Sequence, residues 1–418
     1  MKNWIGSFVL ILTFALQSIS YSQGEAAIPF LVFPTSPTQT AMGVTGTSLP
    51  TDDPYGFLLN PAQLGYTSQS NNLSFIFYPS EINWLGGYVR GLTVSGIALN
   101  LGYNFKNRVG IPISVGIGFA NPELNYGEFI RTTPIDPTPI GTFESKDYYY
   151  AYSMGIGVDY FVQFNAGITY KSITSILSDQ SVSEEQGSGK AEVNSIDYGL
   201  LLNIPIIRLI DDNFTLDIFE NVPSIPFLNL SFGLSRTNIG DEVYYIDPAQ
   251  SDPLPRSARL GYGVSTGMDL QFADTDINIF DLAFTVDAWD ILIERDTTGK
   301  TGYQSGLGDI DFGKHVIQIK GDDKVVSQAG LQISLMETLV IRNGHFSGRA
   351  IQERKTNGIE IRAKGLLKLL NKFSDDQTIK FIADHFDVRY YNTNYFADHA
   401  LETKITGIAL VINGFEFW

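Results

Sequence analysis

Three stretches of the chain alternate large apolar residues with small or polar ones at a period of two. They lie at residues 93–105, 152–164 and 260–272. Because a β-strand sends successive side chains to opposite faces, each stretch has one face of large aliphatic and aromatic residues and one of Gly, Ala, Ser, Asn or Asp. Strands of soluble proteins average about 5–6 residues, whereas a strand that crosses a membrane needs roughly 9–11. The pattern therefore favours a transmembrane β-barrel over a soluble β-sandwich.

The alternation also assigns residues of the first stretch to a face of the barrel wall. The residues predicted to face lipid are Ile97, Leu99 and Leu101. The residues predicted to face the lumen are Gly96, Ala98 and Asn100. An arginine is therefore expected to be tolerated better at Asn100 than at Leu99.

Strand-like segments continue along the chain and are joined by turns rich in Pro, Gly, Asp and Ser. They predict an all-β chain, an up-and-down barrel of about 14 strands over residues 65–418. The candidate strands are residues 71–79, 84–105, 111–120, 148–160, 162–176, 193–204, 227–237, 258–273, 277–293, 314–320, 326–335, 338–348, 356–366, 379–394 and 404–417. Longer connections are expected at residues 121–147, 177–192, 205–226, 238–257 and 294–313, and residues 365–370 have short helical character.

The first 22 residues have the features of a signal peptide. Lys2 supplies a positive charge, an apolar run covers residues 4–16, and Ser20-Tyr21-Ser22 is a small-x-small cleavage site. The run is too short to span a membrane as a helix. We therefore expect export and insertion into the outer membrane of a Gram-negative-type bacterium. The mean hydropathy of +0.01 suits a barrel, where outward apolar and inward polar residues cancel.

Composition excludes several kinds of chemistry. The chain has no cysteine, so disulfides, thiol nucleophiles and Cys-ligated metals are absent. A net charge of −17 argues against nucleic acid as a partner. The four histidines have no metal-ligand spacing, and no nucleophile-elbow or phosphate-binding motif occurs. We expect no enzymatic activity, cofactor or metal site. Acidic pairs between strands are expected to be solvated loop tips.

The chain ends in a strand-like segment with alternating aromatic residues. The expected assembly signal consists of Phe415, Phe417 and Trp418. A carboxyl-terminal aromatic residue is typical of outer-membrane barrels, whose last strand must pair with the first because an open edge is not tolerated in lipid.

Residues 30–64 are not strand-like. They contain small residues and glycines, then an Asp-rich turn, then an Asn-Pro-Ala turn. This opening resembles that of the FadL-like outer-membrane barrels, and within them that of the PorV/PorQ family found with the type IX secretion system. The resemblance implies that residues 23–64 fold inward as a plug. The motif residues are Met42, Gly43, Gly46, Asp52, Asp53, Asn60, Pro61 and Ala62.

Two functions follow from this resemblance. The first is a non-enzymatic barrel that takes part in secretion or surface attachment of type IX cargo proteins, with cargo and other secretion-system proteins as partners. The alternative is a FadL-like transporter of hydrophobic small molecules, in which an apolar ligand is released sideways through the wall. The residues that could line such a ligand site are Phe30, Leu31, Phe33, Phe57 and Leu58. A purely structural membrane protein is the third possibility.

Overall fold

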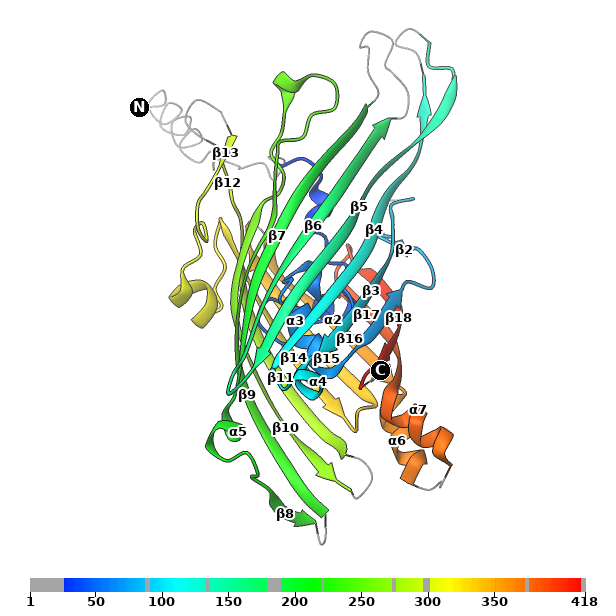
Figure 1. Cartoon of the computed structure of the whole chain (residues 1–418). Coiled ribbons are helices and arrows are strands. Elements are labelled where there is room, and N and C mark those ends of the chain that lie inside the picture. Colours follow the sequence, from blue (N-terminus) through cyan, green and yellow to red (C-terminus); the bar gives the residue numbers. More distant parts are fainter. Residues whose placement is uncertain are drawn as a thin grey trace, which may run out of the picture.

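The computed structural model describes residues 26–86, 91–132, 136–178, 189–219, 222–272, 276–295, 301–349, 351–372 and 376–414. These residues form a closed antiparallel β-barrel with 14 strands in its wall, which confirms the predicted fold class (Figure 1). The wall strands are β1 (Leu73–Phe77), β3 (Thr93–Asn104), β4 (Ile113–Arg131), β5 (Gly141–Asp159), β6 (Gln163–Ser178), β7 (Gly189–Pro205), β9 (Val222–Gly240), β10 (Ser257–Gln271), β11 (Asp276–Ile291), β14 (Val325–Leu335), β15 (Leu339–Gly348), β16 (Ile351–Arg362), β17 (Phe386–Ala397) and β18 (Thr403–Ile412).

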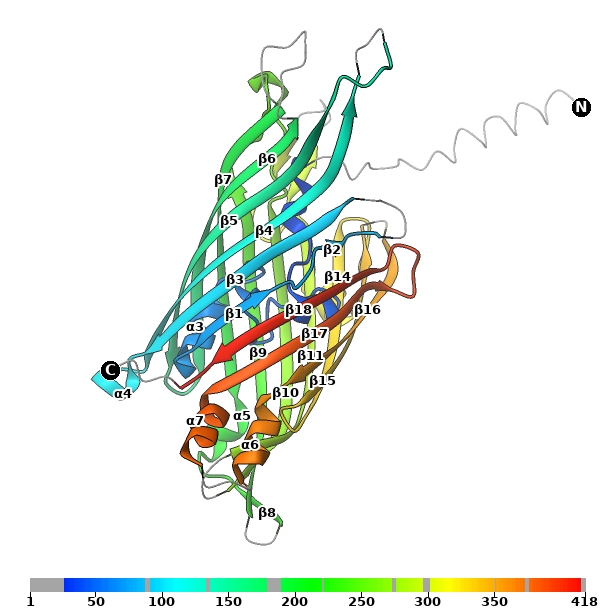
Figure 2. The same ribbon diagram turned by 90° about the vertical axis from the view of Figure 1, so that its right-hand side faces the viewer.

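The short strand β1 closes the barrel. Its Phe75 lies opposite Leu410 of β18 on one side and opposite Leu99 of β3 on the other. Closure pairs the backbone groups of both edges, as a strand in contact with lipid requires. Figure 2 shows this side of the wall, with β18, β1 and β3 next to one another.

The ladder of β1 is interrupted towards the upper end of the barrel as drawn in Figure 1. The two-residue strand β2 (Ile82–Asn83) pairs with β3 beyond the end of β1, and residues 78–81 between them pair with neither neighbour. Tyr78 is buried there, and its hydroxyl donates to the carbonyl of Thr35. The amide of Leu85 bonds the hydroxyl of Thr403, 3.0 Å away. The wall is thus held partly by side chains at this seam.

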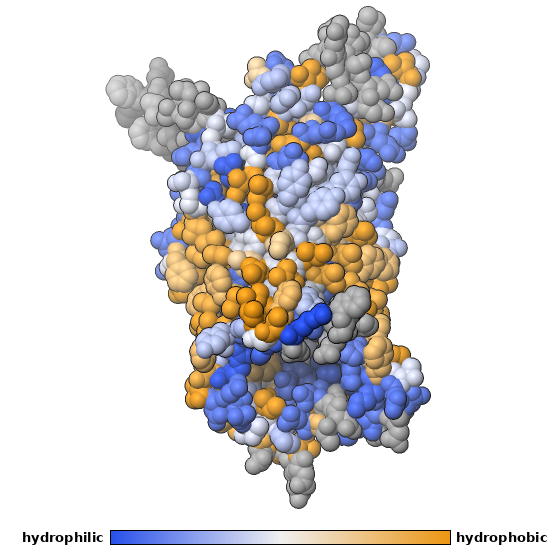
Figure 3. All heavy atoms as spheres, in the orientation of Figure 1, coloured by the Kyte–Doolittle hydropathy of each residue, from blue (hydrophilic) through white to orange (hydrophobic). Residues whose placement is uncertain are grey.

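Large apolar side chains form a belt around the outside of the wall. Ile97, Leu99 and Leu101 are exposed and Ala98 and Asn100 are buried, as the alternation predicted. Figure 3 shows an apolar band across the molecule, with polar surface above and below it. The band is the lipid-facing surface expected of a membrane barrel.

Several strands continue upward beyond this belt. The outward residues of β7 change from Lys190 and Glu192 at its upper end to Ile196, Tyr198 and Leu200 lower down, all exposed. Strands β4, β5 and β6 are similarly long, and together with β7 they project above the rest of the barrel (Figure 1). On β7 the projecting part presents polar side chains outward, as expected of a strand end in water, although the upper ends of β4 and β6 also expose Phe129, Ile130 and Leu177.

Short elements lie at the lower end of the wall and inside the barrel. The helices are α2 (Pro37–Ala41), α3 (Gln63–Thr67), α4 (Lys106–Val109), α5 (Ile206–Ile210), α6 (Lys364–Lys372) and α7 (Gln377–His385), and the short strand β8 (Leu216–Phe219) pairs with β9. Figure 1 places α4 to α7 at the lower end and α2 and α3 inside the barrel. No helix among the described residues is long and apolar enough to cross a membrane.

One connection folds over the outer face of the wall. Between β11 and β14, β12 (Ile293–Arg295) pairs with β13 (Thr301–Tyr303), and the π-helix Phe312–Ile317 follows. Val316 of this helix packs in a buried cluster with Val286, Ala288, Val325 and Ala329. These outward residues are therefore covered by protein.

The structure corrects several sequence-based assignments. Residues 314–320, predicted as a strand, lie largely in the π-helix, and residues 379–385, predicted as the start of a strand, lie in α7. Both are short apolar runs, which fit a strand and a helix equally well. Most of residues 121–147, expected to be a connection, extends β4 and β5, because strands above the belt need no apolar face. The signal peptide and the residues Phe415, Phe417 and Trp418 lie outside the described residues.

The structure removes the basis for expecting an arginine to be tolerated better at Asn100 than at Leu99. The side chain of Asn100 is 2% exposed and its amide donates to the carbonyl of Pro54, so the lumen has no room for an arginine there. Ser95, on the same strand and face as Leu99 but at the upper edge of the belt, is the better comparison, because it lies opposite Glu123 of β4.

We predict that Leu99→Arg destabilises the barrel by about 2–4 kcal/mol, because it places a charge against the lipid core. Ser95→Arg should change stability little, since its side chain can reach water and Glu123. Urea unfolding in lipid vesicles measures both. Equal losses for the two variants would contradict the assignment of the belt.

Candidate functional site

The chain that precedes β1 occupies the lumen (Figure 1). Residues 27–72, called the lumen segment below, form short helices and turns, and all of residues 35–48 are buried. Proline and glycine recur in the segment and prevent a regular strand. It continues past Leu64, where we expected the wall to begin, and α3 still belongs to it.

Inward side chains of the wall bond the backbone of the lumen segment. These hydrogen bonds are needed because a buried peptide group without a hydrogen-bond partner destabilises the folded protein. The bonds run from Thr393 to the carbonyl of Pro37, from Thr356 to that of Ala41, from Arg259 to that of Val44, from Asn100 to that of Pro54 and from Ser114 to that of Gly65. The wall thereby fixes the segment along its whole length.

Asp287 of β11 makes a concentrated contact of this kind. Its carboxylate is buried and accepts the amides of Gly46 and Thr47 at 2.8 and 2.9 Å and the hydroxyl of Ser48 at 3.1 Å. Three donors replace the water that a buried carboxylate loses. The bend after α2 is therefore held against β11.

Inward glycines let the segment lie directly against the wall. A Cβ at Gly233 would clash with the carbonyl of Thr47, and one at Gly167 with the carbonyl of Pro61. Without side chains at these positions, backbone packs on backbone. The glycine face of the strands is thus a contact surface for the lumen segment.

The Asn-Pro-Ala motif forms a turn that is tied to two other parts of the chain. The carbonyl oxygen of the Asn60 side chain accepts the amide of Ala62 at 3.0 Å. Its nitrogen donates to the carbonyls of Thr47 and Leu200, at 2.6 and 3.0 Å. Asn60 therefore joins two bends of the lumen segment to β7.

The two acidic residues of the motif have different environments. Asp53 accepts the Ser36 hydroxyl at 2.6 Å and the Tyr55 amide at 2.8 Å, and burial raises the pKa of its carboxyl. Burial would also raise the pKa of Asp52, but the charge of Arg389 and two hydrogen bonds from it, at 2.7 and 2.5 Å, hold that pKa well below its usual range.

Arg389 belongs to a buried network of charges on the neighbouring strands β15, β16 and β17. It also bonds Asp387 at 2.7 Å, and Glu360 lies 2.6 Å from both Arg342 and Arg362. Asp52 thus connects the lumen segment to this network.

A cavity of about 440 Å³ lies above the segment. Its lining comes from the upper parts of β10, β11 and β14 to β17 and from the seam beside β2. The aromatic residues that line it are Phe33, Trp84, Trp289, Phe346, Tyr395 and Phe396. Four of these rings pack one against the next. The ring centres of Phe33 and Trp84, which are stacked, are 4.8 Å apart, and the ring centre of Tyr395 lies 5.4 Å from that of Trp84 and 5.7 Å from that of Phe346. The lining is apolar apart from a few groups such as Arg259 and Gln328.

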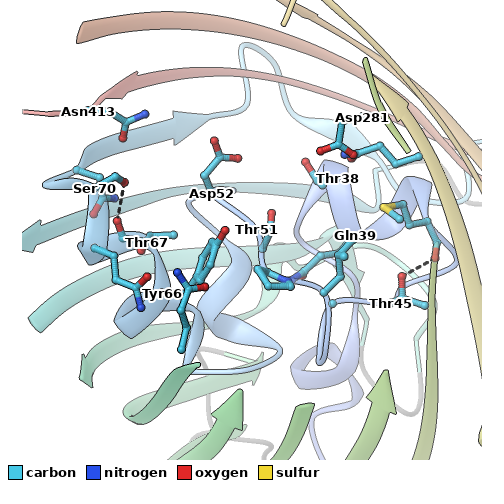
Figure 4. Close-up of a pocket in the computed structure, with 18 of the residues that line it drawn as sticks. Thr38, Gln39, Thr45, Thr51, Asp52, Tyr66, Thr67, Ser70, Asp281 and Asn413 are labelled. Atoms are coloured by element: carbon cyan, nitrogen blue, oxygen red, sulfur yellow. Dashed lines mark hydrogen bonds between the residues drawn. The ribbon is translucent and has the colours of Figure 1, made fainter. Parts of the chain in front are cut away.

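A second cavity, of about 500 Å³, lies below the segment and is polar. Figure 4 shows Thr51, Asp52 and Tyr66 of the lumen segment at this cavity, with Asp281 of β11 on its wall. Arg342, Arg362 and Gln332 also line it.

The different linings of the two cavities reflect an arrangement of side chains that is repeated on three wall strands. Each strand carries an inward aromatic residue near its upper end and an inward charged residue lower down. The pairs are Trp289 and Asp281 on β11, Phe346 and Arg342 on β15, and Tyr395 and Arg389 on β17.

Residues Met42 to Gly46 separate the cavities. Val44 lines the upper cavity, and Met42, Thr45 and Gly46 line the lower one. Gly43 and Val44 have φ of 73° and 64°. A left-handed conformation is rare for a β-branched residue and costs of the order of 1–3 kcal/mol. Hydrogen bonds from Gly43 to Thr356 and from Arg259 to Val44 hold this conformation.

The predicted ligand-lining residues are distributed differently from our expectation. Phe33 lines the upper cavity, whereas Leu31 and Leu58 line a smaller space nearby, Phe30 packs against Tyr149 and Phe57 lies beneath Gly118. Sequence reasoning missed the wall aromatics such as Trp289 and Phe346. Their inward parity was the available signal, but aromatic residues in a membrane strand are usually assigned to the interface with lipid.

No group of three or more His, Asp or Glu residues within the described ranges could hold a metal ion.

No family model and no curated protein matches the chain. Solved barrels are similar to it in structure. The toluene transporter TodX of Pseudomonas putida is 12% identical, with 90% of this chain and 97% of that chain covered and a TM-score of 0.40. The toluene transporter TbuX of Ralstonia pickettii is 11% identical, with 90% and 98% covered and a TM-score of 0.37. A FadL homologue of Pseudomonas aeruginosa is 8% identical, with 92% and 99% covered and a TM-score of 0.36.

We predict that Gly233→Ala destabilises the protein by about 1–3 kcal/mol, because the new methyl group forces Thr47 away from the wall. Gly141→Ala is the matched control, since a Cβ there meets nothing within 4 Å. Urea unfolding measures the loss, and protease cleavage within residues 43–48 reports displacement of the segment. An unchanged Gly233→Ala protein would show that the segment does not pack on this glycine.

Loss of the Asp52 carboxylate should also weaken the attachment of the segment. We expect Asp52→Ala to cost about 1–2 kcal/mol, between the values for surface and buried ion pairs, because the Asp52 side chain is 42% exposed to the lower cavity. Asp212→Ala, in an exposed turn, should cost little.

The pH dependence follows from the sign of the shift. Because the pKa of Asp52 is lower in the folded protein than in the unfolded chain, its stabilisation is present above the unfolded pKa and is lost as pH falls through the folded pKa. The difference in free energy of unfolding between the wild type and Asp52→Ala should therefore be the same at pH 8 and at about pH 5. A difference that disappeared at pH 5 would contradict the lowered pKa.

Proposed function

We propose that the protein is a non-enzymatic outer-membrane channel that binds small hydrophobic compounds in its upper cavity and passes them to the membrane. The observation that carries the proposal is the aromatic lining of this cavity, since the other large cavity of the lumen is polar. Small-molecule sites are typically concave and apolar with a few polar groups, and stacked aromatic rings bind apolar ligands well. The second cavity, lined by charged groups, offers no comparable site.

The proposed route leaves the barrel sideways. The lumen segment separates the upper cavity from the lower one, and passage straight through would bring an apolar compound among charged residues. Trp84, Leu85 and Leu401 line the upper cavity beside the interrupted seam of the wall. Widening this seam breaks few backbone bonds, because residues 78–81 pair with neither neighbour. An apolar compound could pass there into the lipid without crossing the polar cavity.

The type IX secretion hypothesis rests on the resemblance of the first residues, and it stays a prediction. The projecting parts of β4 to β7 are the feature that suits it, as a surface on which cargo proteins could dock. Gene deletion separates the two functions. Failure of cargo to reach the cell surface supports secretion, whereas normal surface display together with poor growth on a hydrophobic nutrient supports transport.

Binding in the upper cavity can be followed by fluorescence, since Trp84 and Trp289 line it. We expect toluene to change the tryptophan emission of the purified protein saturably. Val326→Trp places a large ring in the cavity and should raise the Kd at least about tenfold, which is about 1.4 kcal/mol.

The control is Ala166→Trp, which adds the same bulk on the outward face of β6 beside Phe164 and Ile168. It should leave the Kd unchanged. Binding that both variants retain would place the ligand outside the cavity. A large, steady conductance of the intact protein in planar bilayers would contradict the closed lumen on which the proposal depends.

A further inference from the structure

The helix α6 at the lower end of the barrel has its charged face towards the protein. Lys364, Lys368 and Lys372 are spaced by four residues and therefore share one face. The ammonium groups of Lys364 and Lys368 lie 3.4 and 2.6 Å from the carboxylate of Glu337, in the turn between β14 and β15. The ammonium group of Lys372 lies 3.9 Å from the ring centre of Phe272, which follows β10. Three lysines thus attach α6 to the lower rim of the wall.

The opposite face of α6 is apolar and points away from the barrel. Leu366 and Leu370 lie on this face and are 53% and 58% exposed. A helix on a water-soluble protein has the reverse arrangement, with its apolar face against the core and its charges outward. Helix α7 packs against α6, with Ala383 buried, and exposes Phe381 and Ile382. The hairpin therefore presents one apolar surface outward from both helices.

This surface continues the lipid-facing belt. β17 begins at Phe386, directly after α7, and the rings of Phe381 and Phe386 are 6.1 Å apart. Val388, two residues further on, belongs to the belt and is 50% exposed. In Figure 1 the hairpin stands beside the lower end of the wall, next to the start of β17.

We infer that the α6–α7 hairpin lies in the lipid leaflet at the lower end of the barrel, with its apolar surface against acyl chains. Amphipathic helices bind membranes in this way, parallel to the interface. Lipid is a better occupant than a second protein, because the apolar surface of the hairpin adjoins the belt, which lipid already covers. Lys380 and Asp384, exposed at its margin, lie where headgroups and water begin. The hairpin would connect the turns at Phe272 and Glu337 to the membrane surface.

The absence of cysteine allows a direct test by site-directed spin labelling. Single cysteines are introduced in the full-length protein by Leu370→Cys and Ile382→Cys on the apolar surface. Val388→Cys serves as the belt control and Asp384→Cys as the control on the same helix for the aqueous side. Each labelled protein is reconstituted into phospholipid vesicles, and collision of the label with oxygen and with a water-soluble nickel complex is measured.

We expect labels at positions 370 and 382 to collide with oxygen several-fold more, relative to nickel, than the label at position 384, and to resemble position 388. Nickel accessibility at 370 and 382 equal to that at 384 would overturn the inference. A heat-modifiable shift on gel electrophoresis, required of each variant, establishes that the barrel is folded. Protection of both positions in native membranes but not in vesicles of purified protein would assign the surface to a protein partner and also overturn the proposal.

Discussion

The buried peptide groups of the lumen segment need hydrogen-bond partners, and this need determines both the conformation of the segment and the residues on the inward face of the wall. A chain of short helices and turns has many peptide groups that it cannot pair internally, and inside a barrel they must be paired by the wall. Asn, Asp, Ser and Thr on the inward face supply those partners, and glycines between them allow close approach. Asp287 shows the dependence most directly, because it bonds the amides of Gly46 and Thr47 and the hydroxyl of Ser48.

The same segment divides the lumen into regions of different chemistry. On β11, β15 and β17 the inward face changes from an aromatic residue at the upper end to a charged residue lower down, as with Phe346 and Arg342. Without a barrier between them, water in the lower cavity would reach the aromatic rings. The barrier consists of a few residues around Val44, so its conformation governs whether the two regions stay separate.

The period-two pattern predicted the wall because it reports which face of a strand meets lipid, and lipid contact imposes that pattern strictly. The pattern could not locate the ligand cavity, since Trp289 and Phe346 look like any other aromatic residues of a membrane strand. It also could not show that Asp287 bonds Gly46, because the two are far apart in sequence and no local rule connects them. Residues 379–385 were assigned to a strand because their apolar spacing fits both periods over so short a run.

The charged network beneath the segment explains why a conformation as unfavourable as that of Val44 can persist. Buried ion pairs add little net stability, since desolvation offsets their attraction, but a pair with two parallel hydrogen bonds restricts geometry strongly. Asp52 and Arg389 form such a pair, and Asp387 and Glu360 orient the arginine in turn. With α2 on one side and the Asp287 contact and the Asp52 pair on the other, residues 43 and 44 are held at both ends. The contacts on either side of Val44 therefore keep the barrier in its left-handed conformation.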